Sequence, residues 1–395
     1  MFVGITNIPR DYAWGSSGKI SALLGTTPTG KPEAELWLGA HPGCPSVIID
    51  ASQTGGASDL AMWIQRDDTH ILGDGVTQLP FLLKVLAAGA PLSLQAHPTP
   101  EQAAEGFARE NAAGIPRTAA HRNYKDASAK PELIVAVSDT FEALCGFRSM
   151  ADTRAAIERL AEMDAASGAP TPSLFTEWLA LANGDGDGDI QAMFEWLISA
   201  GDPVPALVER VTALTADGDS DEFALVRTLA SYYPGDPGVL IALMLNHVTL
   251  TQGEALFLPA GNIHAYLGGL GIELMAASDN VLRGGLTPKH VDVPELLSVL
   301  DFSARPVPYL PQTHRSDTVR VYQPPVRDFQ LTVVDGDGSV EIPSAAIMIC
   351  TTGEFSVTGV QGSTTLTRGE AVFVSADEDM LQIRGTGQLF VAATQ

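Results

Sequence analysis

The segment Thr251-Gln-Gly-Glu-Ala-Leu-Phe-Leu-Pro-Ala-Gly-Asn-Ile-His264 decides the fold that we expect for this chain. Its spacing is Gly-x5-Pro-x-Gly-x2-His, and it runs from Gly253 through Pro259 and Gly261 to His264. The glycines and the proline make tight corners, which turn the histidine off the end of a strand. The spacing therefore predicts a presented, metal-capable histidine, although one such match can also arise by chance.

Three polar residues alternate along a second segment, Ala90-Pro-Leu-Ser-Leu-Gln-Ala-His-Pro98, and these are Ser93, Gln95 and His97. In a strand they project from one face, opposite Leu92, Leu94 and Ala96. Such a face, taken alone, is more often simply solvated. Directly after it, Thr99-Pro-Glu-Gln102 predicts a helix start with a Thr cap, Pro at the first position and a Gln that closes a capping box.

A carboxylate that could join the two histidines lies in Lys130-Pro-Glu-Leu-Ile-Val-Ala-Val137. The β-branched residues predict a strand that places Lys130 and Glu132 on one face, opposite Leu133, Val135 and Val137. The alternative is an ordinary solvent-facing Lys and Glu on an edge strand.

Three further segments extend the pattern, and they are Asp11-Tyr-Ala-Trp-Gly-Ser16, Glu35-Leu-Trp-Leu-Gly-Ala-His-Pro42 and the long block from Gly271 to His290. Together these motifs resemble class I mannose-6-phosphate isomerases, zinc enzymes of the cupin superfamily. The spacing from Gly253 to His264 is similar to the second metal-site motif of cupin jelly rolls. The motifs follow the family's order up to about residue 300, and the chain beyond carries none that we identify.

The resemblance implies one Zn²⁺ per chain, held by Gln95, His97, Glu132 and His264. The ligand types alone would also admit manganese, iron or cobalt. It further implies a sugar phosphate substrate, with D-mannose 6-phosphate and D-fructose 6-phosphate interconverted through a cis-enediol. A metal or a fixed cation would stabilise the enediolate charge that develops during this proton transfer.

The resemblance also suggests roles for other residues. We expect Arg283 to be the catalytic cation, and its alternative is an ion pair with Glu273 or Asp279. Glu273 is the first candidate for the general base and Asp279 the second. The candidates for gripping the phosphate are Lys289, Ser93 and Lys130. Aromatic residues that could line a sugar pocket are Tyr12, Trp14 and Trp37, with a buried core position as the safer assumption for Trp37.

A cupin of another class is the alternative function, either a metal-dependent oxygenase or a non-catalytic sugar-binding protein. An oxygenase would more typically use two His and a carboxylate without a Gln ligand. A regulator would usually add a DNA-binding module, and the sequence contains no basic helix-turn-helix segment.

Composition limits the remaining possibilities. The chain has 395 residues, of which 45% are hydrophobic and 18% charged, so we expect a soluble globular protein with two or three domains. A net charge of −24 argues against nucleic acid and anionic membranes as partners, and requires a local cationic pocket for a phosphorylated substrate. The three cysteines are far apart, and the apolar run Val239–Leu245 is too short to span a bilayer. Because the N-terminus lacks a signal peptide pattern, we expect a cytoplasmic location. We also expect the protein to be a monomer.

The order of patterns predicts a mainly β fold, with two cupin-type jelly-roll domains and an inserted α-helical domain. Residues 1–147 show short strands such as Ser46–Asp50, residues 152–233 show helical periodicity, and strand-like sequence returns at Val239. We therefore expect a catalytic cupin domain at 1–149 plus 238–304, a helical insertion at 150–237 and a degenerate cupin domain at 305–395.

An internal repeat supports the last domain, because residues 248–260 align with residues 364–376. In the second copy Ser375 replaces Pro259 and no histidine follows, so we expect this domain to bind no metal. Residues 183–190 imitate a calcium loop, but Phe194 stands where a bidentate Glu is needed. We interpret them as an acidic turn before a helix at Ala192–Leu197, with calcium as a minor alternative.

Overall fold

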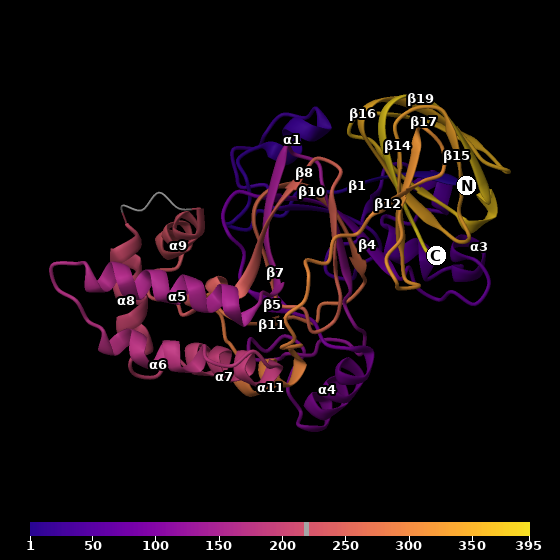
Figure 1. Cartoon of the computed structure of the whole chain (residues 1–395). Helices are drawn as coiled ribbons and strands as arrows, with labels where there is room; N and C mark the ends of the chain where they lie inside the picture. The colour runs from indigo at the N-terminus through magenta and orange to yellow at the C-terminus, as the bar shows by residue number, and fades with distance from the viewer. Residues whose placement is uncertain (217–220) are drawn as a thin grey trace.

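The structure is a computed structural model that describes residues 1–216 and 221–395. Residues 217–220, in the predicted helical region, lie outside the described residues. Figure 1 shows two regions of strands side by side, with a group of helices on the side of the first region that faces away from the second. Each of these two regions is built mainly from β-strands.

The first sheet has nine antiparallel strands. They are β2 (Glu35–Leu38), β4 (Phe81–Ala88), β5 (Gln95–Ala96), β6 (Glu132–Ala136), β7 (Thr140–Phe147), β8 (Leu245–Thr251), β9 (Ala255–Leu258), β10 (His264–Ala276) and β11 (Leu282–Arg283). The central order is β11-β5-β10-β4-β2, while β6 pairs with β10 and β9, and β7 pairs with β10 and β8. The long strand β10 thus pairs with four of the other eight strands and organises this region.

The second sheet has ten strands, mainly from the C-terminal residues. They are β1 (Phe2–Thr6), β3 (Val47–Ile48), β12 (Gln312–His314), β13 (Val319–Tyr322), β14 (Gln330–Val334), β15 (Gly338–Glu341), β16 (Ala346–Thr358), β17 (Ser363–Thr367), β18 (Ala371–Val374) and β19 (Met380–Ala393). The N-terminal strand β1 pairs with β18, so β1 and β3 are exceptions to the predicted division. The reason is tertiary, because Val3 and Ile5 are buried in an apolar core that joins the two sheets.

Five helices form the group at one side of Figure 1, and they are α5 (Met150–Ala165), α6 (Ser173–Leu181), α7 (Asp187–Ile198), α8 (Val204–Thr215) and α9 (Asp221–Tyr232). The helices elsewhere are α1 (Lys19–Leu24), α2 (Leu60–Ile64), α3 (Asp68–Leu72), α4 (Pro100–Ala112), α10 (Gly238–Ile241) and α11 (Val293–Val299), with 3-10 turns η1 (Ala51–Thr54), η2 (Ala242–Met244) and η3 (Ala376–Glu378). Among the described residues, no helix is long and apolar enough to cross a membrane.

The helical group packs against the segment that carries the alternating polar residues. Leu94 and Ala96 are fully buried in the same apolar core as the five helices, whereas Ser93 and Gln95 keep partial exposure on the other side. Only Gln95 and Ala96 pair as a strand, so the predicted strand is shorter than expected although its alternation is present. The predicted capping box is confirmed, since Thr99 and Gln102 hydrogen-bond reciprocally at the start of α4.

The internal repeat is visible as two matching corners. Both corners turn at a glycine with positive φ, +84° at Gly253 and +89° at Gly369. In each corner a glutamate, Glu254 or Glu370, accepts a hydrogen bond from the backbone of the threonine three residues earlier, at 2.7 Å. After the corner β10 begins at His264 and β19 begins at Met380, 116 residues later. The two sheets therefore share one local design.

Two predictions about local structure are wrong. Strand structure does not return at Val239, because that residue lies in α10 and the next strand, β8, begins at Leu245. A short, fully buried apolar run has no periodicity that separates helix from strand. The acidic turn is also shorter than expected: α7 begins at Asp187, and Asp189 accepts a hydrogen bond from the Gly186 N–H, so these acids stabilise a helix start.

The corner before β10 generates a stability prediction. Gly261 has φ +77°, and a Cβ there would lie 3.1 Å from the Val299 carbonyl oxygen and 3.2 Å from Asp301. Gly261→Ala should lower the free energy of unfolding by about 1 kcal/mol through the positive φ and by roughly 1–3 kcal/mol more through the forced contact.

The matched control is Gly30→Ala, because Gly30 has φ +79° but nothing within 4 Å of its added Cβ. Thermal unfolding should show a clearly lower Tm for the first variant than for the control. Equal losses would contradict a packing role for Gly261.

Candidate metal centre and active site

Three buried side chains from different elements converge inside the first sheet. His97 Nε2 lies 3.2 Å from Glu132 Oε1, and His264 Nε2 lies 3.3 Å from Glu132 Oε2. One donor atom from each residue lies within 4.8 Å of the others, and the three residues are 1%, 3% and 4% exposed for His97, Glu132 and His264. The structure thus brings together three of the four predicted ligands.

Backbone carbonyls fix the proton on each imidazole. His97 Nδ1 donates to the Asn280 carbonyl at 2.7 Å, and His264 Nδ1 donates to the Asn262 carbonyl at 3.0 Å. A neutral imidazole has one N–H, so both Nε2 atoms present lone pairs toward the carboxylate. His97 Nε2 is buried without a hydrogen-bond partner among the described residues. Converging lone pairs of this kind are suited to a shared cation.

The fourth predicted ligand, Gln95, faces His264 directly across the β5–β10 pair. Directly opposed residues of antiparallel strands project to the same side, with Cβ atoms about 5 Å apart. The Gln95 amide nitrogen donates to the Ser93 hydroxyl at 3.3 Å, so the amide oxygen is the atom that could bind a metal. The corner is tied to the same segment, since the Gly261 N–H donates to the His97 carbonyl at 2.8 Å.

Glu132 is not solvent-facing, which excludes the edge-strand alternative. Strand β6 is paired on both sides, and all five of its residues are buried. Burial alone would raise the pKa of Glu132, but Lys130, 2.8 Å away, and the two histidines lower it well below its usual range. Burial also lowers the pKa of His97 to about 4, so its ring is neutral near pH 7. Both groups are therefore held in the protonation states that bind metals.

A second buried cluster lies beside this centre, and the sequence analysis did not identify its cation. Lys84, in the middle of β4, is 2.9 Å from Glu273 and 3.3 Å from Glu35. Burial by itself lowers the pKa of Lys84, but Glu273, Glu35 and Glu132 outweigh it and raise that pKa. Burial raises the pKa of Glu273, which Lys84 only partly offsets. The sequence feature that could have indicated this cluster is the single lysine, Lys84, within the otherwise apolar run Phe81–Ala88.

The cluster continues outward through an aromatic residue to Asp279. The Trp37 indole N–H donates to Glu35 at 2.9 Å, and its ring meets His41 edge-on at 5.0 Å. His41 Nδ1 accepts the Gly43 N–H at 3.1 Å, so its Nε2–H points to Asp279, 3.4 Å away. This contact lowers the pKa of Asp279, whose side chain is 46% exposed. Trp37 is therefore half-buried among polar groups, and the core assumption for it is wrong.

Arg283 has no ion pair with Glu273 or Asp279, which pair with Lys84 and His41 instead. It lies opposite Gln95 in the β11–β5 pair, and burial lowers its pKa. The pKa of Lys289 is lowered by burial and then by the charges of Arg283 and Lys125. These three cations have no acidic partner within 4 Å in the part of the chain that the structure describes. They form a local cationic cluster in an acidic protein.

The remaining predicted residues lie around the same region with different partners. Lys130 is 8% exposed and bound to Glu132, so it is less available to a phosphate than Lys289. Trp14 is half-buried, with its ring 5.8 Å from that of Tyr12. Tyr266, which the sequence analysis did not single out, is buried, and its hydroxyl has no hydrogen-bond partner among the described residues.

The Lys84–Glu273 pair generates a stability prediction. Lys84→Met should lower the free energy of unfolding by about 3–5 kcal/mol, because it leaves buried carboxylates without their cation. Adding Glu273→Leu should recover much of this loss. The second sheet supports that expectation. Leu389 in β19 lies 116 residues after Glu273 in β10, and it faces Val334, whereas Glu273 faces Lys84. The corresponding pair in the second sheet is therefore apolar. Denaturant unfolding of wild type, single and double variant tests it, and a double variant no more stable than the single one would contradict it.

Comparisons with known proteins agree with this geometry. Residues 3–150 match the family "Phosphomannose isomerase type I, catalytic domain", and residues 321–394 match "Mannose-6-phosphate isomerase, cupin domain". The mannose-6-phosphate isomerase of Salmonella typhimurium is 37% identical over 395 residues, covering 98% of this chain and 97% of that protein. The Homo sapiens enzyme of that name is 32% identical over 405 residues, covering 94% and 92%.

Solved structures give the same result. A crystal structure of mannose 6-phosphate isomerase in its zinc-bound holo form matches with a TM-score of 0.89 at 35% identity, covering 100% of this chain and 99% of that one. A crystal structure of the apo form from Salmonella typhimurium matches with a TM-score of 0.88 at 34% identity and the same coverage. With these similarities spanning its full length, and with the cupin match at its C-terminus, the chain belongs to the mannose-6-phosphate isomerase family.

Proposed function

We propose that this protein is a metal-dependent aldose–ketose isomerase that interconverts D-mannose 6-phosphate and D-fructose 6-phosphate. Family membership supports the reaction. The observation that carries the metal dependence is the convergence of His97, Glu132 and His264, with both imidazole Nε2 lone pairs directed at the carboxylate. A coupled assay for fructose 6-phosphate formed from mannose 6-phosphate tests the proposal directly.

Zinc fits this donor set. Two imidazoles and a carboxylate, joined by the Gln95 amide oxygen, form a borderline set that leaves room for water or substrate. The zinc-bound relative supports zinc over manganese, iron or cobalt. When bound, the metal supplies Lewis-acid stabilisation of developing negative charge on oxygen. Lys130 keeps Glu132 ionised, and the Asn280 and Asn262 carbonyls keep the two rings aligned.

The cationic cluster of Arg283, Lys289 and Lys125 is the proposed counterpart of the substrate's negative charge. Arg283 lies across from the predicted ligand Gln95, so we assign it to the enediolate that forms during the reaction. Lys289 and Lys125 are exposed, and we assign them, together with Ser93, to binding the phosphate group of the substrate. Free cations at this place overcome the net charge of −24 locally.

Proton transfer between C2 and C1 needs a base, and two carboxylates remain as candidates. Burial raises the pKa of Glu273, which makes it a stronger base than an ordinary carboxylate, and Lys84 can donate to an adjacent sugar oxygen. The pKa of Asp279 is lowered by His41, which makes it a weaker base. We therefore keep Glu273 as the first candidate and the cis-enediol as the intermediate.

We also propose the domain organisation in its finer form. Two jelly rolls would account for the matching corners and the shared strand order, with the helices α5–α9 as an insertion in the first. The boundaries follow the predicted ranges, apart from β1 and β3, which join the second sheet. Cytoplasmic location and a monomeric state remain predictions.

A different cupin function is the alternative. The sequence alone left open a metal-dependent oxygenase or a non-catalytic sugar-binding protein. Absence of isomerase activity in fully metal-loaded protein would favour these alternatives.

The first prediction here concerns metal content. Chelation should abolish isomerase activity and zinc should restore it, because His97, Glu132 and His264 converge on one buried point. Elemental analysis should find one zinc per chain in the wild type and none in the double variant His97→Ala, His264→Ala. The control is His247→Ala, whose partly exposed ring lies 3.9 Å from Glu142 and should leave the zinc content unchanged. Full activity in exhaustively demetallated protein would contradict the proposal that the enzyme needs a metal.

The second prediction concerns Arg283. If it acts on charge that develops only in the transition state, Arg283→Ala should lower kcat by roughly 100-fold with zinc content at the wild-type level. Arg283→Lys should fall between the two, because it keeps the charge but loses the planar fork. A normal kcat, or loss of zinc from the variant, would instead assign Arg283 a structural role.

A further inference from the structure

The second sheet contains a structural counterpart of the metal centre. Glu341 faces Met380 at the start of β19, as Gln95 faces His264 at the start of β10. Pro343 follows Glu341 by two residues, as His97 follows Gln95 by two residues, so Pro343 is the counterpart of His97.

The counterpart of Glu132 follows from the same register. Glu132 faces Met275 in β10, and Met348 faces Val391, 116 residues later, in β19. The metal donors are thus replaced by Pro343 and the thioethers of Met348 and Met380, with one carboxylate left at Glu341. That set does not suit a hard or borderline divalent cation.

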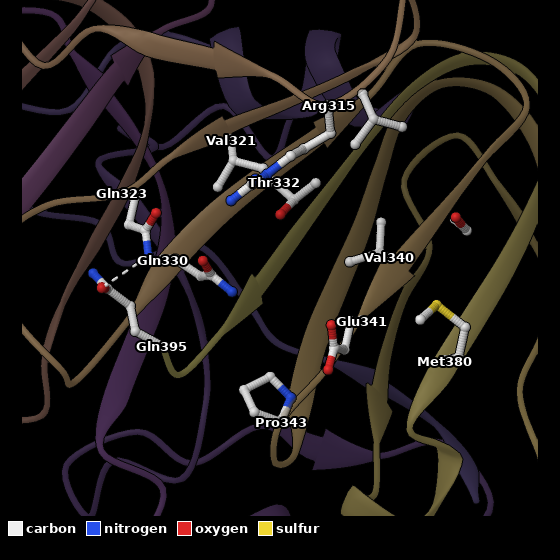
Figure 2. Close-up of a pocket in the computed structure, with 12 residues that line it drawn as sticks. Arg315, Val321, Gln323, Gln330, Thr332, Val340, Glu341, Pro343, Met380 and Gln395 are labelled. Atoms are coloured by element: carbon white, nitrogen blue, oxygen red, sulfur yellow. Dashed lines mark hydrogen bonds between the residues drawn. The ribbon is translucent and has the colours of Figure 1, made fainter.

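The position is nevertheless hollow. A cavity of about 520 Å³ opens there, within the size range of small-molecule sites. Figure 2 shows it between β13 and β14 on one side and β15 with Met380 on the other. We call it the C-terminal cup, and its walls are made by Arg315, Val319, Val321, Gln323, Gln330, Thr332, Ser339, Val340, Glu341, Pro343, Met380 and Gln395.

Several polar groups of the cup lack partners. Across residues 1–216 and 221–395, the side chains of Arg315, Gln330, Thr332 and Glu341 make no hydrogen bond or ion pair. Thr332 is only 4% exposed, and it lines the cup. Arg315 stays unpaired in a chain with 47 acidic and 23 basic residues. In Figure 2 the side chains of Arg315, Gln330 and Glu341 project into the same hollow.

We propose that the C-terminal cup binds a small open-chain polyol that carries a phosphate or carboxylate group. The Arg315 guanidinium matches such an anion. Glu341 would repel a bare anion, so the ligand must also bring hydroxyl donors, and Gln330 and Thr332 can bond further hydroxyls. None of the described residues that line the cup is aromatic, so a sugar ring finds no stacking platform and an open chain fits better. This site is separate from the proposed isomerase centre and does not depend on its activity.

The test uses the full-length, zinc-loaded protein and mannitol 6-phosphate, an open-chain polyol phosphate that the isomerase cannot turn over because it has no carbonyl group. Equilibrium dialysis should find two sites per chain in the wild type and one in Arg315→Ala, with kcat for isomerisation unchanged. In the Lys289→Ala background, where the active site should hold the phosphate more weakly, Arg315→Ala should weaken binding at least tenfold. Thr332→Val should weaken it as well.

The matched control is Arg384→Ala, because Arg384 is an exposed arginine of β19 that does not line the cup. This variant should keep both sites. Because Arg315 is itself exposed, its variant tests the cup even if Thr332→Val fails to fold. A single site in the wild type, a second site that survives Arg315→Ala, equal affinity for inorganic phosphate, or binding of a free amino acid instead would each overturn the proposal.

Discussion

The structure around the centre depends on one interaction, the contact of the buried Glu132 carboxylate with the Nε2 atoms of His97 and His264. Each partner comes from a different segment, and each imidazole is turned by a backbone carbonyl rather than by a side chain. Burial makes uncompensated lone pairs and charge expensive, so a cation at the middle of this convergence would stabilise it. The surrounding pairs, including Lys130 with Glu132, serve that constraint.

The two sheets have matching strand pairings, but equivalent buried positions carry charged residues in one and apolar residues in the other. In the first, buried charges such as Lys84 and Glu273 occupy positions where the second has Val334 and Leu389. The matching corners also hold the regions together, because each contacts the other region. The Tyr322 hydroxyl donates to the Gly253 carbonyl at 2.6 Å, and Arg368 Nε donates to the Leu23 carbonyl at 2.8 Å. The second copy therefore has a structural role whether or not its cup binds a ligand.

Errors in the sequence analysis share a physical origin. The residues around Val239 are apolar throughout, so periodicity could not show that they form a short buried helix. Trp37 resembles a core residue by type, but its neighbours Glu35, Lys84 and His41 make its surroundings polar. Both cases depend on which segments meet in space, and a single sequence does not encode that locally.

The sequence by itself determined the features that depend on spacing and alternation. These include the Gly253-to-His264 corner, the apolar face of Leu94 and Ala96, the Thr99 capping box, the repeat and the metal-capable side chains. Local backbone chemistry acts over a few residues, so these patterns are legible without a fold. Only the tertiary structure decided the tautomers of the two histidines, the partner of Lys84 and the entry of β1 into the second sheet. Each of these joins residues far apart in the chain, and the deciding energy is burial of charge or apolar surface, which exists only once the sheets have closed.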